Sequence, residues 1–161
     1  MSRGLKRVKI RNMENEKSPE KEPVVSFRET TDEDFDFVFN LNKANMRKYV
    51  EEMRGWDDEF EREDMKKKFT PGVDRVIQID GKDAGILKVL ETDEEIKLDH
   101  VELLPEYQGQ GLGSKIIGDL INKNKPIRLQ VLKQNPAVEL YKKLGFEIVG
   151  ETDLKYQMLR K

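Results

Sequence analysis

The amino-acid sequence predicts an α/β (α+β) fold, with about four helices and a mixed, mostly antiparallel sheet of six or seven strands. Two patterns carry this prediction. Apolar residues recur at three- and four-residue steps between residues 35 and 53, as one buried helix face requires, and shorter segments downstream alternate apolar and polar residues, as half-buried strands do. The elements follow the order β-α-α-β-β-β-α-β-α-β-β, and a length of 161 residues favours a single domain.

The first strand is predicted at residues 24–28, and two helices follow it. Three residues offer an N-cap for the first helix: Thr30, Thr31 and Asp32. Its buried stripe consists of Phe35, Val38, Phe39, Met46, Tyr49, Val50 and Met53. Gly55 interrupts this pattern, and Asp57 or Asp58 caps a second helix that ends at residues 70–72. The apolar face of the second helix is formed by Phe60, Met65 and Phe69.

Three strands are predicted next, at residues 73–79, 84–90 and 96–104. The Asp80-Gly81 pair between the first two is a hairpin turn sequence. In the third strand the alternation of apolar and polar residues breaks at Val101, which a β-bulge would explain.

The remaining elements are, in order, a helix at 111–122, a strand at 127–132, a helix between Asn135 and Gly145, and strands at 146–149 and 155–159. Asn135 is the expected N-cap of the last helix, with Pro136 at its first position, and Gly145 is the expected C-cap.

Composition excludes several classes of function. The chain has a formal net charge of -2, so no global basic field favours nucleic acid as a partner. It contains no cysteine and one histidine, His100, which excludes disulfides, a cysteine nucleophile and a histidine-rich metal site, and no metal is expected.

No run is apolar enough to cross a membrane, and the expected location is cytoplasmic. Residues 1–23 are basic and then polar, and are expected to form a disordered tail before a folded domain at residues 24–161, with Met13 as an alternative start.

A glycine-rich loop lies at residues 108–113, between the strand predicted at residues 96–104 and the helix that follows it. Glycines let backbone N–H groups face an anion, and the helix N-terminus adds partial positive charge, so phosphate binding is the natural interpretation. The loop is not a Walker sequence, because Ser114 precedes Lys115. It is not a dinucleotide-binding Gly-x-Gly-x-x-Gly sequence either. The third glycine of that pattern would fall on Ser114 if the pattern began at Gly109, and on Ile116 if it began at Gly111.

Two motifs together resemble the GNAT superfamily of N-acetyltransferases. Gln108-x-x-Gly111-x-Gly113 is similar to the family's pyrophosphate-binding loop. Residues 135–146, Asn-Pro-Ala-Val-Glu-Leu-Tyr-Lys-Lys-Leu-Gly-Phe, resemble the family's second hallmark, with every fixed position filled. The resemblance implies a sheet splayed open between its fourth and fifth strands, with acetyl-CoA as a cosubstrate in the opening. It also makes a homodimer reasonable.

The resemblance implies a function and a set of cofactor contacts. The expected activity is transfer of acetyl from acetyl-CoA to a primary amine by direct attack, on a small molecule in preference to a peptide or protein. The alternatives are a protein lysine or N-terminal acetyltransferase and a non-catalytic acyl-CoA sensor; a nucleic-acid role for the basic tail is disfavoured by the net charge. The residues implied to contact acetyl-CoA are Val101, Leu103, Leu104, Gln108, Gly109, Gln110, Gly111, Leu112, Gly113, Ser114, Asn135 and Tyr141.

The implied chemistry requires a proton donor and a base. Tyr141 matches the family's general acid, and a core aromatic residue is the alternative interpretation. Glu102 and His100 are the candidate bases, on one face of a strand if the alternation holds between them, although an ordinary strand role or a water chain explains the sequence equally well. Gln130 stands where the ribosomal-protein branch of the family carries a glutamate, which disfavours protein N-terminal acetylation.

The acceptor amine is expected to meet the segment that joins the first two helices. Tyr49, Glu52 and Trp56 are the candidate substrate-binding residues, because an aromatic ring with nearby carboxylates attracts a cationic amine. An ordinary solvated acidic segment is the alternative.

Overall fold

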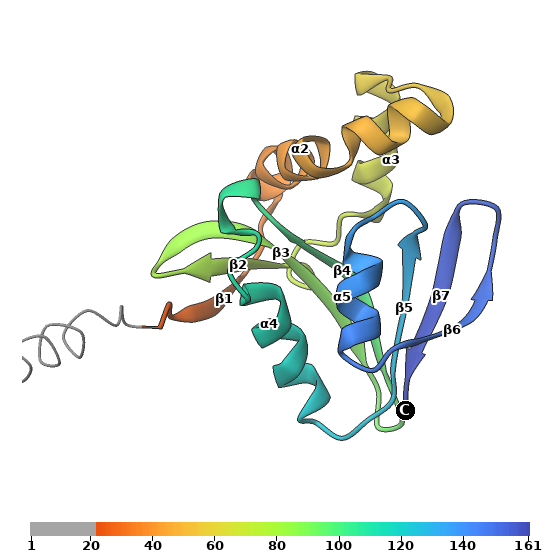
Figure 1. Ribbon diagram of the computed structural model, residues 1–161. Coiled ribbons are helices and arrows are strands. Elements are labelled where there is room, and N and C mark those ends of the chain that lie inside the picture. The colour runs from red at the N-terminus through yellow and green to blue at the C-terminus, as the bar shows by residue number, and fades with distance from the viewer. Residues whose placement is uncertain (1–21) are drawn as a thin grey trace, which may run out of the picture.

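The computed structural model describes residues 22–161, which form one seven-stranded sheet covered by helices on both faces (Figure 1). The expected tail at residues 1–23 therefore lies almost wholly outside the described residues. The strand order is β1-β2-β3-β4-β5-β7-β6. The strands are β1 (Val25–Glu29), β2 (Arg75–Ile79), β3 (Lys82–Glu91), β4 (Ile96–Leu103), β5 (Ile127–Leu132), β6 (Glu147–Glu151) and β7 (Lys155–Arg160).

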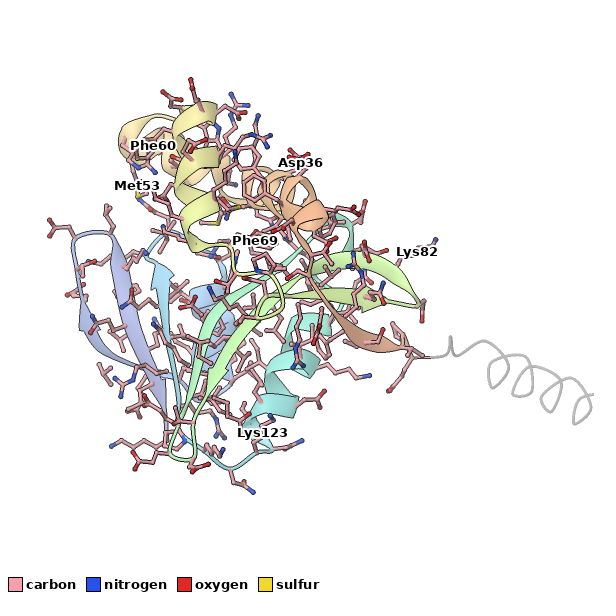
Figure 2. All side chains as sticks on the ribbon, turned by 180° about the vertical axis from the view of Figure 1, so that it is seen from behind. Asp36, Met53, Phe60, Phe69, Lys82 and Lys123 are labelled. Atoms are coloured by element: carbon pink, nitrogen blue, oxygen red, sulfur yellow. The ribbon has the colours of Figure 1, made fainter. Side chains whose placement is uncertain are left out.

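Four α-helices and two 3₁₀ turns connect these strands: η1 (Asp32–Asp34), α2 (Phe35–Arg54), α3 (Asp58–Lys68), η2 (Pro105–Tyr107), α4 (Leu112–Ile121) and α5 (Ala137–Lys143). The main core lies between the sheet and the pair α4 and α5, while α2 and α3 pack on the other face through a smaller cluster around Val38, Leu41 and Ile86. Figure 2 shows Met53 and Phe69 in the α2–α3 layer. The predicted order of elements is confirmed, and most boundaries agree to within two residues.

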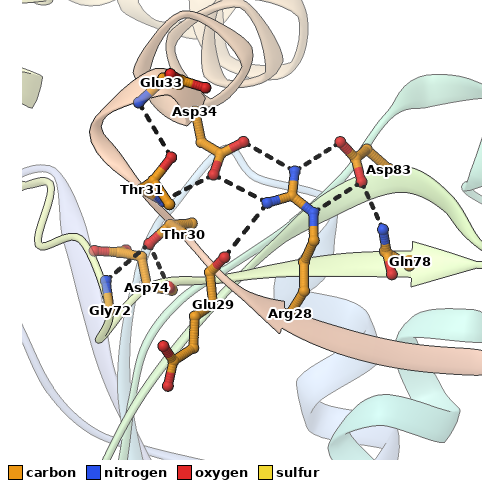
Figure 3. Close-up of polar contacts among 10 residues, drawn as sticks. All are labelled: Arg28, Glu29, Thr30, Thr31, Glu33, Asp34, Gly72, Asp74, Gln78 and Asp83. Carbon is orange, nitrogen blue, oxygen red and sulfur yellow. Dashed lines mark hydrogen bonds and ion pairs between the residues drawn. The ribbon is translucent and has the colours of Figure 1, made fainter.

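The expected N-caps are present, with one difference. Asp57 accepts a hydrogen bond from the Phe60 amide at 3.0 Å and so begins α3. Thr31 caps the short η1 turn instead of the long helix, in a reciprocal capping box with Asp34. Asp34 is also paired with Arg28, whose guanidinium bridges it to Asp83 (Figure 3). This bidentate clamp joins β1 and β3 to the start of α2.

The sheet opens between β4 and β5, as expected. These two strands pair in parallel only at their first residues, from Ile96 opposite Ile127 to Leu98 opposite Leu129. Beyond this point no ladder joins them, whereas β7 pairs with the other edge of β5 along the whole length of that strand. The second half of β4 therefore presents an unpaired edge to the space between the two strands.

A bulge in β4 sorts its side chains between the two faces. Lys88 of β3 lies opposite His100 and Val89 lies opposite Leu98, so Asp99 is the extra residue. The bulge precedes the position at which the alternation breaks, Val101. It keeps the apolar residues of β4 in the α4–α5 core and leaves His100 and Glu102 together on the α2–α3 face.

Gly85 of β3 is required by the close approach of β4. A Cβ at this position would overlap the backbone carbonyl oxygen of Glu102, which a rigid strand cannot move away. We expect Gly85→Ala to lower the free energy of unfolding by about 2 kcal/mol, as overpacking does. Urea unfolding checks this, with Gly118→Ala as the control. Gly118 lies inside α4 with nothing near an added Cβ, so that variant should gain about 0.5–1 kcal/mol, and equal effects would contradict the account.

Candidate active site

Two cavities meet where the sheet opens. The first, the α3 cavity, has a volume of about 520 Å³ and lies between the α2–α3 layer and strands β3, β4 and β5. The second, the loop cavity, has a volume of about 400 Å³ and lies between the unpaired edge of β4, the glycine loop and helices α4 and α5. Five residues line both cavities: Met46, Val101, Glu102, Asn135 and Tyr141. A molecule reaching from one cavity to the other must pass these five residues.

The glycine loop ends the loop cavity with a row of free amides. None of the six consecutive backbone N–H groups from Gly109 to Ser114 donates to an acceptor within residues 22–161, and the first bond of α4 is made by Lys115 to the Gly111 carbonyl. Gly109 and Gly111 have φ values of 74° and 81°, the left-handed region that glycine adopts without strain. Together with the positive end of the α4 dipole, these amides can bind a phosphate or pyrophosphate.

The unpaired edge of β4 forms the wall of the loop cavity. The Leu104 amide donates to the Ala84 carbonyl at 2.8 Å, on the β3 side. Because backbone groups of successive strand residues point to opposite sides, those of Val101 and Leu103 face the opening. The Leu103 carbonyl already accepts from Asn45 and Gln108, each at 2.9 Å. The backbone groups of Val101 therefore stay available to an extended ligand along β4.

His100 and Glu102 form a close pair on the floor of the α3 cavity. The Nε2 atom of His100 lies 2.6 Å from Oε1 of Glu102. Asn42 and Asn45, one turn apart on α2, donate to Oε1 and Oε2 of Glu102 at 2.7 and 3.3 Å. An ionised carboxylate only accepts hydrogen bonds, so Nε2 carries the proton that is shared with Glu102. Nδ1 is then the nitrogen of His100 that takes up or releases a proton.

The surroundings of the pair favour its charged form. Burial disfavours charge on both groups, but the hydrogen bond and the Coulomb attraction between them outweigh burial. The pKa of Glu102 is lowered as a result, with further help from the amides of Asn42 and Asn45. The pKa of His100 is raised by Glu102, with smaller contributions from Asp74 and Asp99.

Tyr141 stands at the junction of the two cavities. Its ring packs against Phe146 with centroids 5.6 Å apart, and its hydroxyl makes no hydrogen bond to residues 22–161. Burial, with a smaller contribution from the Glu102 carboxylate, raises the pKa of Tyr141 to about 12. The phenol therefore stays protonated at neutral pH and can donate a hydrogen bond into the junction.

Comparison with known proteins relates the central part of this arrangement to one family of domains. Residues 75–148 match the model of the acetyltransferase (GNAT) domain, and this range includes the glycine loop, the His100–Glu102 pair and Tyr141. These residues are therefore similar to a GNAT acetyltransferase domain. The match indicates an acyltransferase. No curated protein sequence matches the chain.

Solved GNAT structures share this fold at low sequence identity. The PaiA N-acetyltransferase of Thermoplasma acidophilum, in complex with coenzyme A, is 18% identical with a TM-score of 0.65, over 86% of this chain and 99% of that one. The ribosomal-protein-S18-alanine N-acetyltransferase of Escherichia coli is 18% identical with a TM-score of 0.56, over 85% and 93%. Arabidopsis thaliana Naa50, in complex with the bisubstrate analogue CoA-Ac-MVNAL, is 17% identical with a TM-score of 0.56, over 85% and 98%.

Most residues that the GNAT resemblance assigned to the cofactor line the loop cavity: Val101, Leu103, Gln108, Gly109, Gly111, Gly113, Ser114, Asn135 and Tyr141. Leu104, Gln110 and Leu112 do not line it. Leu104 packs against the α2 cluster, Leu112 is buried in the core, and the side chain of Gln110 donates to the Glu106 carbonyl at 2.8 Å.

Asn135 of the second GNAT motif has a structural role that is visible in the fold. Its side-chain oxygen accepts from the Ala137 amide at 2.9 Å, and its carbonyl accepts from the Val138 amide at 3.1 Å. It thus caps α5 as expected, although the regular helix begins one residue later than expected, with Pro136 as the flanking residue. It lines both cavities as well, so the two interpretations of Asn135 are compatible.

Of the three residues expected to bind the acceptor amine, only one lines either cavity. Tyr49 lines the loop cavity, whereas Glu52 and Trp56 line neither cavity. The indole nitrogen of Trp56 donates to Asp58 at 3.1 Å, and its ring lies against Phe39. The α3 cavity is lined by other residues of the same helices, among them Met53, Arg54, Glu61 and Met65. Sequence reasoning missed these residues, together with Asn42 and Asn45.

Neither a metal-binding cluster nor a helix able to span a membrane is found among the described residues. Within residues 22–161, no group of histidine, cysteine, aspartate or glutamate side chains is arranged to hold a metal ion. In the same range, no helix has both the length and the apolar character needed to cross a membrane.

The pH dependence of stability should report the His100–Glu102 pair. The pKa of His100 is raised from 6.5, so its contribution is complete below pH 6.5 and is lost as the pH rises through the raised pKa. The pKa of Glu102 is lowered from 4.5, so its contribution is complete above pH 4.5 and is lost as the pH falls through the lowered pKa. Both contributions are therefore complete between pH 4.5 and 6.5.

We expect the free energy of unfolding to fall between pH 6 and pH 9 in the wild type, and to fall less in His100→Gln. Urea unfolding at several pH values measures the difference between the two proteins. An identical fall in both would show that the pair does not link pH to stability.

Proposed function

We propose that this protein is an N-acetyltransferase that moves the acetyl group of acetyl-CoA to a primary amine by direct attack. The observation that carries the proposal is the junction of the two cavities, where Tyr141 and the His100–Glu102 pair stand between a phosphate-binding loop and a second, separate cavity. Donor and acceptor can enter from the two sides and meet at the junction.

The loop cavity supports acetyl-CoA as the donor. The free amides of residues 109–114 suit its pyrophosphate, and the available backbone of Val101 suits an extended arm with amide groups. Acetyl-CoA supplies a thioester carbonyl and a thiolate leaving group. The Val101 amide is our candidate donor to the carbonyl oxygen, in the manner of an oxyanion hole.

We assign the base to His100, with Glu102 as the residue that orients it. Glu102 fixes the proton on Nε2, so in the neutral form of His100 the Nδ1 atom takes the proton of the attacking amine. Glu102 by itself is the poorer base, because its pKa is lowered while that of His100 is raised.

Tyr141 is assigned as a hydrogen-bond donor to the departing sulfur. Its pKa is about 12, whereas that of a thiol is about 8.5. Complete proton transfer would be uphill by about 3.5 units, or about 5 kcal/mol. A hydrogen bond from the phenol stabilises the thiolate without this cost.

We further propose a small-molecule acceptor in preference to a peptide. Leu154 and Lys155 at the β6–β7 turn line the α3 cavity opposite α2 and α3, so the cavity is bounded from several elements. Arg54 and Glu61, 2.6 Å apart, join α2 to α3 at the same cavity. Gln130, which also lines it, provides no carboxylate base on β5.

Thiol release from acetyl-CoA, followed against small primary amines and against peptides with free N-termini or lysines, tests this proposal. Turnover should be faster with a small amine than with any peptide. Faster turnover with peptides would overturn the acceptor class, and CoA binding without turnover on any amine would favour an acyl-CoA sensor.

A further inference from the structure

We propose that Asn45 is a positioning residue that connects the glycine loop to the His100–Glu102 pair through Gln108. The inference concerns the regulation of the site described above and rests on the proposed function only where CoA is involved. It assigns to Gln108 a role other than direct contact with the cofactor.

The connection is a continuous chain of hydrogen bonds. Nε2 of Gln108 donates to Oδ1 of Asn45 at 2.9 Å, and Nδ2 of Asn45 donates to Oε2 of Glu102 at 3.3 Å. Both amides are also tied to the Leu103 carbonyl, each at 2.9 Å. The chain thus runs from the residue that precedes the free loop amides to the carboxylate that contacts His100.

The orientation of both amides follows from their partners. Turning the Asn45 amide over would place its oxygen against the Glu102 carboxylate and its NH₂ group against the NH₂ group of Gln108. Turning the Gln108 amide over would place its oxygen against the Leu103 carbonyl. Only the observed arrangement gives every donor an acceptor.

Asn45 differs from its neighbour Asn42 in what it controls. Oε1 of Glu102 has two partners, Asn42 at 2.7 Å and His100 at 2.6 Å, whereas Oε2 has only Asn45 among residues 22–161. Removing Asn45 frees Oε2 and lets the carboxylate turn. Removing the Asn42 side chain takes one hydrogen bond from Oε1 of Glu102 but leaves the connection from Asn45 to Gln108 in place.

The connection couples occupancy of the loop to the state of the base. An anion on the amides of residues 109–114 fixes the loop, and with it Gln108 and Asn45. Glu102 is then held against His100 when the donor is present. Nine other charged residues line the α3 cavity with His100 and Glu102, and none of them is changed in the variants below: Arg54, Glu61, Asp64, Lys68, Asp74, Lys88, Lys97, Asp99 and Lys155.

The test uses the fact that His100 is the only histidine of the chain. NMR titration of its ring protons, in untagged protein, reads its midpoint without assignment. The free protein is measured as wild type, Asn45→Ala, Gln108→Ala and the double variant. Both single variants should lower the midpoint, by up to about one unit for Asn45→Ala, because a charge-assisted contact is loosened. The double variant should shift no further than Asn45→Ala.

Folding is expected to survive these changes, because Asn45 is partly exposed within α2 and alanine favours helices. Gln110→Ala is the matched loop control and should leave the midpoint unchanged, since within residues 22–161 the Gln110 side chain hydrogen-bonds only to the Glu106 carbonyl. Additive shifts in the double variant, or no shift in Asn45→Ala, would overturn the proposal without reference to any ligand.

A second arm adds CoA, with binding measured separately by calorimetry. CoA should move the His100 midpoint in the wild type and in Asn42→Ala, and should fail to move it in Asn45→Ala although CoA still binds. A shift of equal size in Asn45→Ala would overturn the coupling. Absence of CoA binding to the wild type would instead refute the proposed function, and the free-protein arm would still decide the role of Asn45.

Discussion

Replacing Tyr141 by phenylalanine is expected to lower kcat for acetyl transfer by about 10²- to 10³-fold, with little change in stability or in CoA affinity. The phenol hydroxyl makes no hydrogen bond to residues 22–161, so its loss removes no visible structural contact. The ring and its packing on Phe146 remain in the variant. What is lost is the phenol donor at the junction of the two cavities, and this loss is felt only when charge develops on the departing sulfur.

Steady-state kinetics with calorimetry on the same variant separates these effects. Tyr156→Phe is the matched control, because Tyr156 packs against the same core but lines neither cavity. It should keep the wild-type kcat. A Tyr141→Phe protein that binds CoA and turns over at the wild-type rate would remove Tyr141 from the chemistry.

Replacing Ser114 by aspartate is expected to weaken CoA binding by about 100-fold or more while the thermal stability stays equal or rises. Ser114 lies in the first turn of α4 and lines the loop cavity. A carboxylate there is favourable for the helix, because it complements the positive N-terminal dipole. The same charge repels a pyrophosphate on the neighbouring amides.

Opposite effects on stability and on binding distinguish an anion site from a structural turn. Calorimetry of CoA and thermal unfolding are measured on wild type, Ser114→Asp and Ser114→Ala. The alanine variant, which adds no charge, should bind within a few-fold of the wild type. Equal CoA affinity in all three proteins would mean that the phosphates do not lie at α4.

The sequence was sufficient for the fold because its local patterns agree with the tertiary structure. The alternating strands, the Asp80-Gly81 turn and the Asp57 cap all appear as expected. The exact position of the β4 bulge could not be predicted from the sequence. The alternation in β4 breaks at Val101, but the inserted residue is Asp99, because only pairing with β3 determines which residue is left out of the ladder.

The candidate site was predicted in part. The two motifs placed the loop and Tyr141, and strand alternation placed His100 beside Glu102. Asn42 and Asn45 left a weak signal, namely two polar residues within the apolar stripe of a long helix. Their partner, Glu102, lies about sixty residues away, and such long-range contacts leave no local trace. Trp56 illustrates the converse, since an aromatic residue near carboxylates packed against Phe39 instead of lining a cavity.

Calorimetry of acetyl-CoA with the wild-type protein tests the central claim most directly. The account predicts saturable one-site binding in the micromolar to millimolar range, competition by CoA, and thiol release once an acceptor amine is added. Absence of binding at millimolar acetyl-CoA would contradict it, because the free amides of residues 109–114 would then belong to a structural turn and the loop cavity would have no assigned occupant.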